Sequence, residues 1–185
     1  MTRFVAFDPN TEVTGASALA FITNINHEDM AGILKKYHLD TIDPQQWYPQ
    51  QSVLDVYSDI SERVNASMNF VAIGMAVGDL GVKNLPPHML TMPLIDFFVA
   101  YGAVYQSRHR NGDAGYVKAE REDDTHIIFR IRTPYPDDFI YGTLYSYARH
   151  LIKANQHFTM TYDKTLKRRD QGGDETVLHL TIKES

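Results

Sequence analysis

The stretch GYVKAEREDDTHIIFRIRTPYPDDFIYGTLYSYARHL, residues 115–151, carries most of the information that decides the fold. Residues 116–120 and 125–132 predict two strands joined by an acidic turn. In the second strand one face carries Ile127, Phe129 and Ile131, and the other carries Ile128, Arg130 and Arg132. Pro136 suits the first position of a helix, and the two aspartates after it suit the first helical turn. This stretch therefore predicts two strands followed by a helix.

Two further strands follow this helix. Apolar and polar residues alternate over 158–162 and again over 177–182. The connection 164–174 is charged and contains glycine, so we expect it to be exposed and mobile. We predict an α+β fold class, with an N-terminal helical subdomain followed by a helix and a four-stranded antiparallel sheet with a ββαββ layout.

The first part of the chain predicts helices after an extended arm over residues 1–13. Apolar residues recur at helical spacing in these segments: 15–25, 30–37, 53–64, 68–80 and 93–110. Glycines and the pair Pro86-Pro87 interrupt the pattern before the last helix. We predict a single domain, 1–185, made of a mainly helical subdomain (1–92) and an α+β subdomain of ligand-binding type (93–185).

Composition narrows the class of protein. The chain has 185 residues, of which 43% are hydrophobic and 22% charged, as in ordinary globular proteins. A net charge of −5 repels phosphates and argues against a nucleic-acid partner. The absence of cysteine excludes disulfides, thiolate ligands and a cysteine nucleophile. No apolar run approaches the roughly 20 residues of a membrane span, and no signal peptide is recognised, so a cytoplasmic location is expected.

In the order of its predicted elements the chain resembles one superfamily, which unites three groups of proteins. These are the haem nitric-oxide/oxygen-binding (H-NOX) domains, the vinyl-reductase-type small-molecule-binding domains and the core subunits of the vesicle-tethering TRAPP complex. The resemblance covers most of the chain, and residues 93–185 best. It implies a hydrophobic ligand held between helices and sheet, either haem or an acyl-like molecule, and often a dimer.

The chain departs from H-NOX domains in its haem motif. Such a domain has a haem-ligating histidine on the helix before the sheet, and Tyr-x-Ser-x-Arg where the second strand runs into the next helix. Here His109 lies at the end of the helix, and the place of the motif reads Arg130-Ile-Arg132-Thr-Pro134. No cofactor is therefore predicted, and haem is kept as an alternative whose usual motif is missing.

The strongest local candidate is an anion pocket formed by Arg130, Arg132 and Tyr135. The two arginines project from one strand face, and a helix N-terminus follows them. The alternative is that Asp137 and Asp138 pair with these arginines at an exposed edge, which we favour about two to one over the anion pocket. In the binding interpretation, Arg132 and Tyr135 hold the polar head of a ligand.

Aromatic residues predict the apolar part of the same site. Tyr101 and Tyr105 lie one helical turn apart, and with Tyr116 and Phe129 they suit a cavity between helix and sheet. Ordinary core packing is an equal alternative. His109 completes the predicted ligand-binding residues, although a histidine in a helix C-terminal turn is also a common structural feature.

The sequence predicts a non-catalytic sensor or carrier that binds a small hydrophobic or amphipathic ligand. The alternatives are a haem- or tetrapyrrole-binding gas sensor and a structural dimeric partner protein without ligand. Neither a catalytic motif nor a metal-ligand spacing among the histidines is present, so no catalytic or metal residues are predicted. An enzyme with scattered residues stays open, with Asp137 or Asp138 and His109 as the first candidates for a base. A homodimer also stays open.

Overall fold

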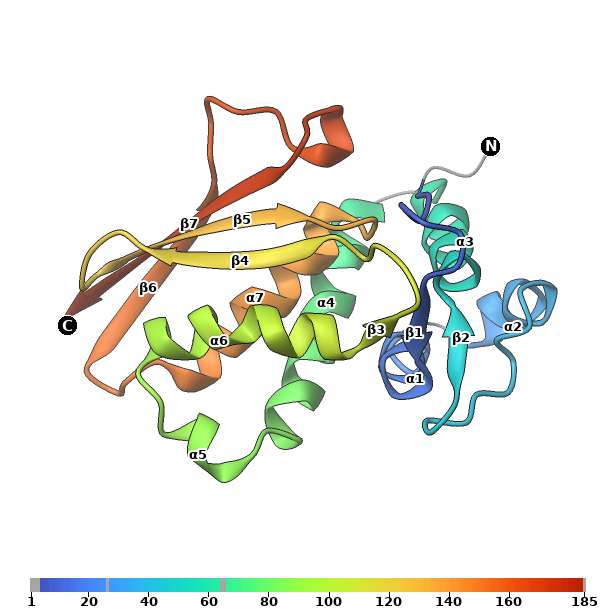
Figure 1. Ribbon diagram of the computed structural model, residues 1–185, viewed down its shortest axis with the longest axis horizontal. Helices are drawn as coiled ribbons and strands as arrows, with labels where there is room; N and C mark the ends of the chain where they lie inside the picture. Colours follow the sequence, from blue (N-terminus) through green and yellow to red (C-terminus); the bar gives the residue numbers. More distant parts are fainter. Residues whose placement is uncertain (1–3, 26, 64–65, 185) are drawn as a thin grey trace.

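In the computed structural model of the chain, residues 4–25, 27–63 and 66–184 are described. A four-stranded sheet extends along one end of the molecule, and a smaller, mainly helical part lies at the other end (Figure 1). The helices are α1 (Gly15–Ile22), α2 (His27–Lys36), α3 (Gln50–Ser61), α4 (Ala66–Lys83), α5 (Pro87–Leu90), α6 (Leu94–Ser107) and α7 (Asp137–Leu151). The predicted α+β fold class is confirmed.

The large sheet is antiparallel throughout, in the order β4-β5-β7-β6. Its strands are β4 (Tyr116–Arg121), β5 (His126–Arg132), β6 (Gln156–Tyr162) and β7 (Thr176–Glu184). Ile127, Phe129 and Ile131 of β5 are buried, and the residues between them are half-buried. The buried face packs on the helices, since the ring of Phe98 in α6 lies 4.8 Å from that of Phe129. The alternation in the sequence thus sets which face forms the core.

Helices α4 and α7 cross very closely. A Cβ atom on Gly142 of α7 would lie 2.2 Å from the carbonyl oxygen of Val71, and one on Gly74 of α4 would lie 2.1 Å from the carbonyl oxygen of Phe139. These two glycines therefore allow the helix backbones to touch. Through this crossing the helical half of the chain packs against the helix that lies between β5 and β6.

A small sheet links the two halves of the chain. Its order is β2-β1-β3, with β1 (Glu12–Thr14), β2 (Trp47–Pro49) and β3 (His109–Arg110). In its antiparallel register Val13 of β1 pairs with Tyr48 on one side and His109 on the other. Because Val13 is buried, this sheet fixes the position of His109 relative to the helical half.

Several predicted boundaries are corrected by the structure. The helix from Leu94 ends at Ser107, and His109 lies in β3 rather than on the helix. The helix predicted over 15–25 ends at Ile22, and the arm predicted over 1–13 ends in β1. The predicted residues 1–3 and 64 lie outside the described residues. His109 leaves the helix because its backbone pairs with β1, a contact that helical spacing does not reveal.

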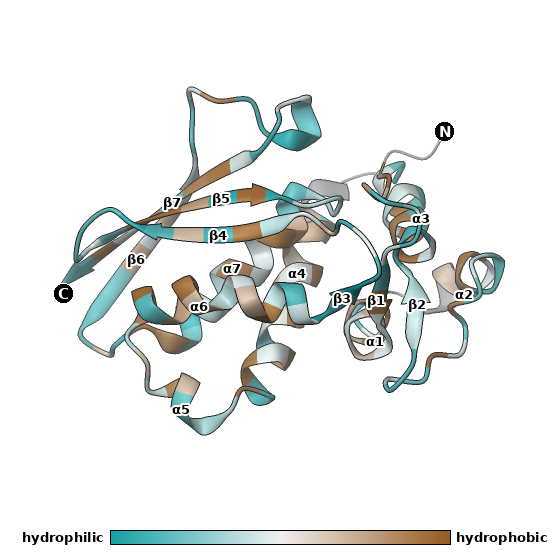
Figure 2. Ribbon diagram, in the orientation of Figure 1, coloured by the Kyte–Doolittle hydropathy of each residue, from teal (hydrophilic) through white to brown (hydrophobic). Residues whose placement is uncertain are grey.

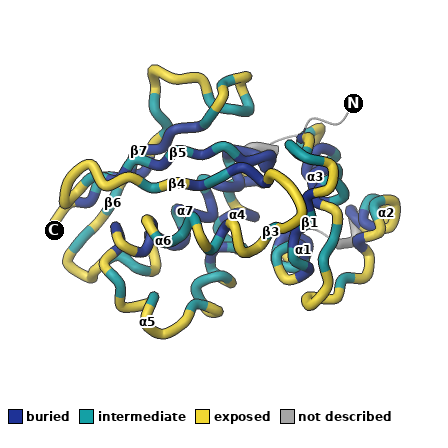
Figure 3. Tube along the Cα trace, in the orientation of Figure 1, coloured by how far each residue is buried: buried dark blue, intermediate teal, exposed yellow. Residues whose placement is uncertain are grey.

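The distribution of polar residues follows this architecture. Hydrophobic colours concentrate on the packed helices and strands, whereas the connection between β6 and β7 is mainly hydrophilic (Figure 2). That connection contains the short 3-10 helix η1 (Arg169–Gln171), and it is exposed or half-buried along its length (Figure 3). None of the described helices combines the length and apolar character that crossing a membrane requires.

Candidate functional site

A cavity of about 340 Å³ lies between the helical half of the chain and the helices that support the large sheet. We call it the tyrosine cavity. Its lining comes mainly from α1, α4, α6 and α7, with β3 and the β5–α7 connection at one end. The volume is near the lower limit of small-molecule pockets, roughly 300–1,000 Å³. The lining includes Phe21, Val53, Tyr57, Val77, Tyr101, Val104, Tyr105, Arg108, His109, Tyr135, Phe139, Ile140 and Tyr147.

His109 occupies the polar end of this cavity. Its Nδ1 lies 2.9 Å from the carbonyl oxygen of Tyr105, and its Nε2 lies 2.9 Å from the hydroxyl of Tyr135. A carbonyl oxygen only accepts hydrogen bonds, so Nδ1 carries the proton and Nε2 accepts from Tyr135. Burial lowers the pKa of His109, although the Tyr105 carbonyl acts in the opposite direction. The neutral imidazole therefore directs a lone pair toward Tyr135.

Gln50 extends this chain of hydrogen bonds into the helical half. Its Nε2 lies 3.2 Å from the Tyr135 hydroxyl, to which it donates. Gln50 is fully buried, and its Oε1 has no hydrogen-bond partner among the described residues. An unpaired buried carbonyl costs about 1–3 kcal/mol. Gln50, Tyr135 and His109 thus form a relay, and they come from α3, the β5–α7 connection and β3.

Local structure explains how the relay is assembled. Gln50 is the first residue of α3, directly after Pro49, and its backbone N–H donates to the carbonyl of Thr11 at 2.9 Å. Tyr135 lies between two prolines, which favour extended backbone before the start of α7. The three side chains therefore meet where the small sheet adjoins the beginning of α7.

The walls of the tyrosine cavity carry neutral hydroxyl groups. Burial raises the pKa of Tyr101, Tyr105, Tyr135 and Tyr147, so these phenols stay protonated. Tyr105 donates to the carbonyl of Ala114 at 2.6 Å. The rings of Tyr101 and Tyr147 lie 5.2 Å apart. The cavity is therefore apolar in most directions, with polar groups at fixed points.

Arg108 is the cation of the cavity. It is exposed, it lines the cavity beside exposed Leu80 and Asn84, and its positive charge lowers the pKa of Tyr101 and Tyr147 against the effect of burial. Among the described residues its guanidinium group has neither an ion pair nor a hydrogen bond. Arg108 is thus available to pair with an acidic group at the cavity mouth.

The predicted site residues fall into two groups. Tyr101, Tyr105, His109 and Tyr135 line the tyrosine cavity together. The others lie outside its lining: Tyr116, Phe129, Arg130 and Arg132. The ligand-binding role of either group stays a prediction.

The residues of the second group have partners within the chain. Phe129 is core, and the Tyr116 hydroxyl donates to Glu175 at 3.1 Å. Arg130 pairs with Glu175 at 2.6 Å, and Arg132 pairs with Asp113 at 3.0 Å. These arginines bind carboxylates other than those of Asp137 and Asp138.

The two aspartates at the start of α7 have their own partners. Asp137 accepts from the Thr176 hydroxyl at 2.6 Å and from the Asp170 backbone at 3.0 Å. Burial raises the pKa of Asp137. Asp138 pairs with Arg168 at 3.0 Å. These bonds join α7 to the β6–β7 connection and to the start of β7.

Sequence reasoning missed Gln50, and it favoured a helix C-cap for Arg108 over a clamp for a carboxylate. Arg108 reads as a cation at a helix C-terminus, which is a common stabilising feature. Gln50 carries no sequence signal at all, because its role depends on Tyr135, 85 positions away. The one available hint for Arg108 was Tyr105, a predicted lining residue three positions earlier, on the face of α6 that leads to the end of the helix.

Comparisons with known proteins support the fold. No protein-family model and no curated protein sequence matches the chain. Among solved structures it is similar to an unliganded Fe(II) H-NOX protein variant from K. algicida, with a TM-score of 0.69, 11% identity and coverage of 93% of this chain and 97% of that chain. A variant H-NOX protein from S. oneidensis in the Fe(II) ligation state gives 0.68 at 11% identity, with the same coverages.

A third similar structure is an oxygen complex of an oxygen-binding H-NOX domain related to soluble guanylate cyclases. Its TM-score is 0.67 at 13% identity, with coverage of 92% of this chain and 93% of that chain. At these identities the likeness shows the fold alone. The chain thus has the fold of H-NOX domains, as the resemblance in element order implied.

Proposed function

We propose that this chain is a non-catalytic, sensor-type module that binds an amphipathic ligand with an acidic group in the tyrosine cavity. The observation that carries the proposal is the arrangement of Arg108 and the His109–Tyr135–Gln50 relay around one apolar cavity. An apolar ligand body fits the aromatic walls. Its carboxylate or similar group pairs with Arg108, which has no ion pair within the described residues.

The relay gives such binding a route to the rest of the molecule. A ligand whose hydroxyl or N–H donates to the unprotonated His109 Nε2 takes the place of the Tyr135 hydroxyl at that nitrogen, and the hydrogen bond from Gln50 to Tyr135 then changes as well. Because these residues belong to β3, the β5–α7 connection and α3, ligand binding changes the contact between the helical half and the sheet half. This is the coupling that a sensor requires, since a ligand acts only through contacts that differ between two states.

Haem is the rival ligand, and the comparisons favour it, because the similar solved structures are H-NOX proteins described as oxygen-binding or in Fe(II) states. The donor chemistry fits. His109 donates its Nδ1–H to a backbone carbonyl, as metal-ligating histidines do, and Nε2 keeps a lone pair directed into the cavity. Haem bound there would place iron on His109, carboxylates near Arg108 and the macrocycle against the tyrosines.

The space does not fit haem as the side chains stand. A metal ion about 2 Å from an imidazole nitrogen would overlap the Tyr135 hydroxyl, which lies 2.9 Å from Nε2. The cavity volume of about 340 Å³ also favours a smaller ligand. Haem binding therefore requires Tyr135 to leave the cavity, whereas a smaller acid does not.

A paired titration separates the two ligands. The purified chain is titrated with haem, followed by its Soret absorption, and with decanoate, followed by calorimetry. We expect decanoate to bind and Arg108→Gln to weaken it at least tenfold, whereas Arg121→Gln leaves affinity unchanged, since Arg121 pairs with Asp124 on the β4–β5 hairpin.

The variant Tyr135→Ala tests haem, the rival ligand, by an increase in affinity rather than a loss. It vacates the position next to His109 Nε2, so it strengthens haem binding if haem is the ligand. Haem binding by the wild-type chain that is lost in His109→Ala would replace the small-acid proposal. Failure of both ligands to bind would overturn the assignment of the tyrosine cavity as a site for acidic ligands.

A further inference from the structure

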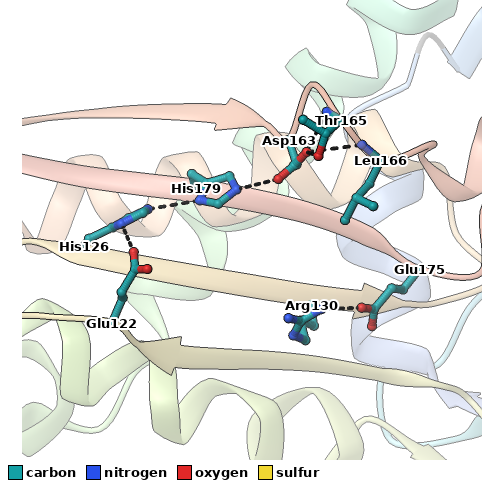
Figure 4. A network of polar contacts seen from close by, with 8 residues as sticks. All are labelled: Glu122, His126, Arg130, Asp163, Thr165, Leu166, Glu175 and His179. Carbon is teal, nitrogen blue, oxygen red and sulfur yellow. Dashed lines mark hydrogen bonds and ion pairs between the residues drawn. The ribbon is translucent and has the colours of Figure 1, made fainter.

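The face of the large sheet opposite the helices carries a row of linked polar side chains. Glu122, His126, His179 and Asp163 follow one another across it (Figure 4). His126 lies on β5 and His179 on the neighbouring β7, where the register places His179 opposite Ile128, two positions along from His126. Asp163 directly follows β6, and Glu122 belongs to the β4–β5 turn. Both imidazoles are partly buried, with 23% and 28% of the side chain exposed.

Each histidine has one nitrogen on a carboxylate and the other on its neighbour. His126 Nδ1 contacts Glu122, and His179 Nε2 lies 3.0 Å from Asp163 Oδ2. The two remaining nitrogens, His126 Nε2 and His179 Nδ1, face each other at 3.0 Å. Carboxylates thus orient both rings so that their inner nitrogens point at a common place (Figure 4).

Two neutral imidazoles do not supply enough N–H groups to complete this row. It has three links, and two neutral imidazoles supply only two N–H groups. When both histidines donate to their carboxylates, two lone pairs face each other across 3.0 Å. An additional proton resolves this conflict, and so does a metal ion held between the inner nitrogens. The two carboxylates next to the histidines favour a cation at this point.

We propose that His126 and His179 bind a divalent transition-metal ion, Zn²⁺ or one of similar preference, on the outer face of the sheet. Imidazole nitrogens are favoured ligands of such ions. With Zn–N distances of about 2.0–2.1 Å, two nitrogens of a tetrahedral site are roughly 3.3 Å apart, so the observed 3.0 Å needs to open by only a few tenths of an ångström.

The outer partners match the usual surroundings of metal-bound histidine. A histidine ligand commonly donates its other N–H to a carboxylate, which fixes the ring and its tautomer. Both histidines have such a partner. Asp163 is itself held in place, since its Oδ1 accepts from the Thr165 backbone at 2.7 Å and the Thr165 hydroxyl at 2.6 Å.

The site is an open one. Within the described residues, no group of three or more histidine, aspartate or glutamate side chains is arranged around one metal position. His126 and His179 therefore supply two ligands, and the remaining positions belong to water or to a group from a bound molecule. The site is separate from the tyrosine cavity, whose lining contains neither histidine.

The test is a calorimetric titration of the untagged full chain with Zn²⁺ at pH 7.5, after treatment with a chelator and dialysis. We expect one equivalent to bind, and His126→Gln and His179→Gln each to weaken binding by more than about tenfold. Glu122→Ala removes a carboxylate partner and no ligand, so a loss of about 10–100-fold is expected. The matched control is His157→Gln on β6, an exposed histidine of the same sheet face, and it leaves the affinity unchanged.

Thermal unfolding gives a second readout that does not depend on calorimetry. Zn²⁺ raises the unfolding midpoint of the wild type and of His157→Gln, because an ion that binds only the folded state stabilises it. It leaves the midpoint of His126→Gln unchanged. Circular dichroism of the metal-free variants shows whether they are folded, and Glu122→Ala tests the site if either histidine variant is not. Absence of Zn²⁺ binding by the wild type, or binding by both histidine variants as tight as that of the wild type, would overturn the proposal.

Discussion

The small sheet and the outer face of the large sheet use the same kind of side chain in opposite ways. In β3 of the small sheet, His109 is bound by a carbonyl and a phenol, both neutral, at the end of an apolar cavity. On the outer side, His126 and His179 are bound by carboxylates. Burial lowers the pKa of His109, whereas two carboxylates flank the pair formed by the other two imidazoles. The surroundings of each imidazole, rather than its presence, thus determine what it can bind.

The largest expected effect on stability comes from truncating a side chain on the buried face of the large sheet, compared with its neighbour on the outer face. Ile127→Ala removes atoms from a fully buried position, so we expect it to lower the free energy of unfolding by about 2–5 kcal/mol. Ile128→Ala, one residue later and only half-buried, is expected to cost about 1 kcal/mol. Chemical denaturation of both variants measures the difference. Equal losses would show that the two faces are not distinguished as described.

The relay is tested next by Tyr135→Phe, which removes one hydroxyl and keeps the ring. His109 Nε2 and the Gln50 amide then both lose their partner, so a loss of about 1–3 kcal/mol is expected. Tyr116→Phe removes a half-buried hydroxyl on the outer face, and less than about 1 kcal/mol is expected. Urea unfolding compares the two. A smaller loss of unfolding free energy for Tyr135→Phe than for Tyr116→Phe would show that the relay does not stabilise the fold.

The neutral state of His109 predicts a pH dependence of stability. Its pKa is lower in the folded chain than in the unfolded chain, where it is about 6.5. The unfolded state therefore binds more protons below that value, and stability decreases as the pH falls through 6.5. The slope from this one group is at most about 1.4 kcal/mol per pH unit. Unfolding of the wild type and His109→Gln between pH 7.5 and 5.5 measures it, and parallel curves would contradict the assignment.

The smallest effect is expected for Arg132→Ala. The ion pair with Asp113 is exposed, and Arg132 also stacks on the Phe7 ring at 4.0 Å, so the loss of stability is expected to be about 1 kcal/mol. Because Arg132 lies outside the lining of the tyrosine cavity, we expect affinity for an acidic ligand to be unchanged. Calorimetry of Arg132→Ala and Arg108→Gln with the same ligand tests this. A tenfold loss of affinity in Arg132→Ala would show that the strand arginines, and not Arg108, bind the acidic group of the ligand.

The fold could be predicted where short-range patterns determine it. The apolar residues at every second position of 127–131, and Pro136 followed by aspartates, gave β5 and the start of α7 correctly. The small sheet could not be predicted, because β1 and β2 have three residues each and β3 has two, too few for a periodic signal. For the same reason His109 was assigned to a helix.

The sites depend on contacts that spacing does not encode. His126 and His179 are 53 positions apart, and only the register of β5 with β7 brings them together. Tyr101 and Tyr105 were predicted as lining residues because they lie one helical turn apart, whereas Tyr135 was predicted beside Arg132 and meets them only in the folded chain. Arg108 was assigned to a helix end, since its lack of an ion pair is visible only in three dimensions.

The most direct test of ligand binding in the tyrosine cavity is native mass spectrometry of the full chain purified gently from its own host. We expect the folded wild type to carry additional mass that is lost on denaturation, and Arg108→Gln to carry clearly less of it. The size of that mass distinguishes haem from a smaller acid. A wild-type chain that shows only its own mass, before and after incubation with excess decanoate or haem, would contradict the proposed function.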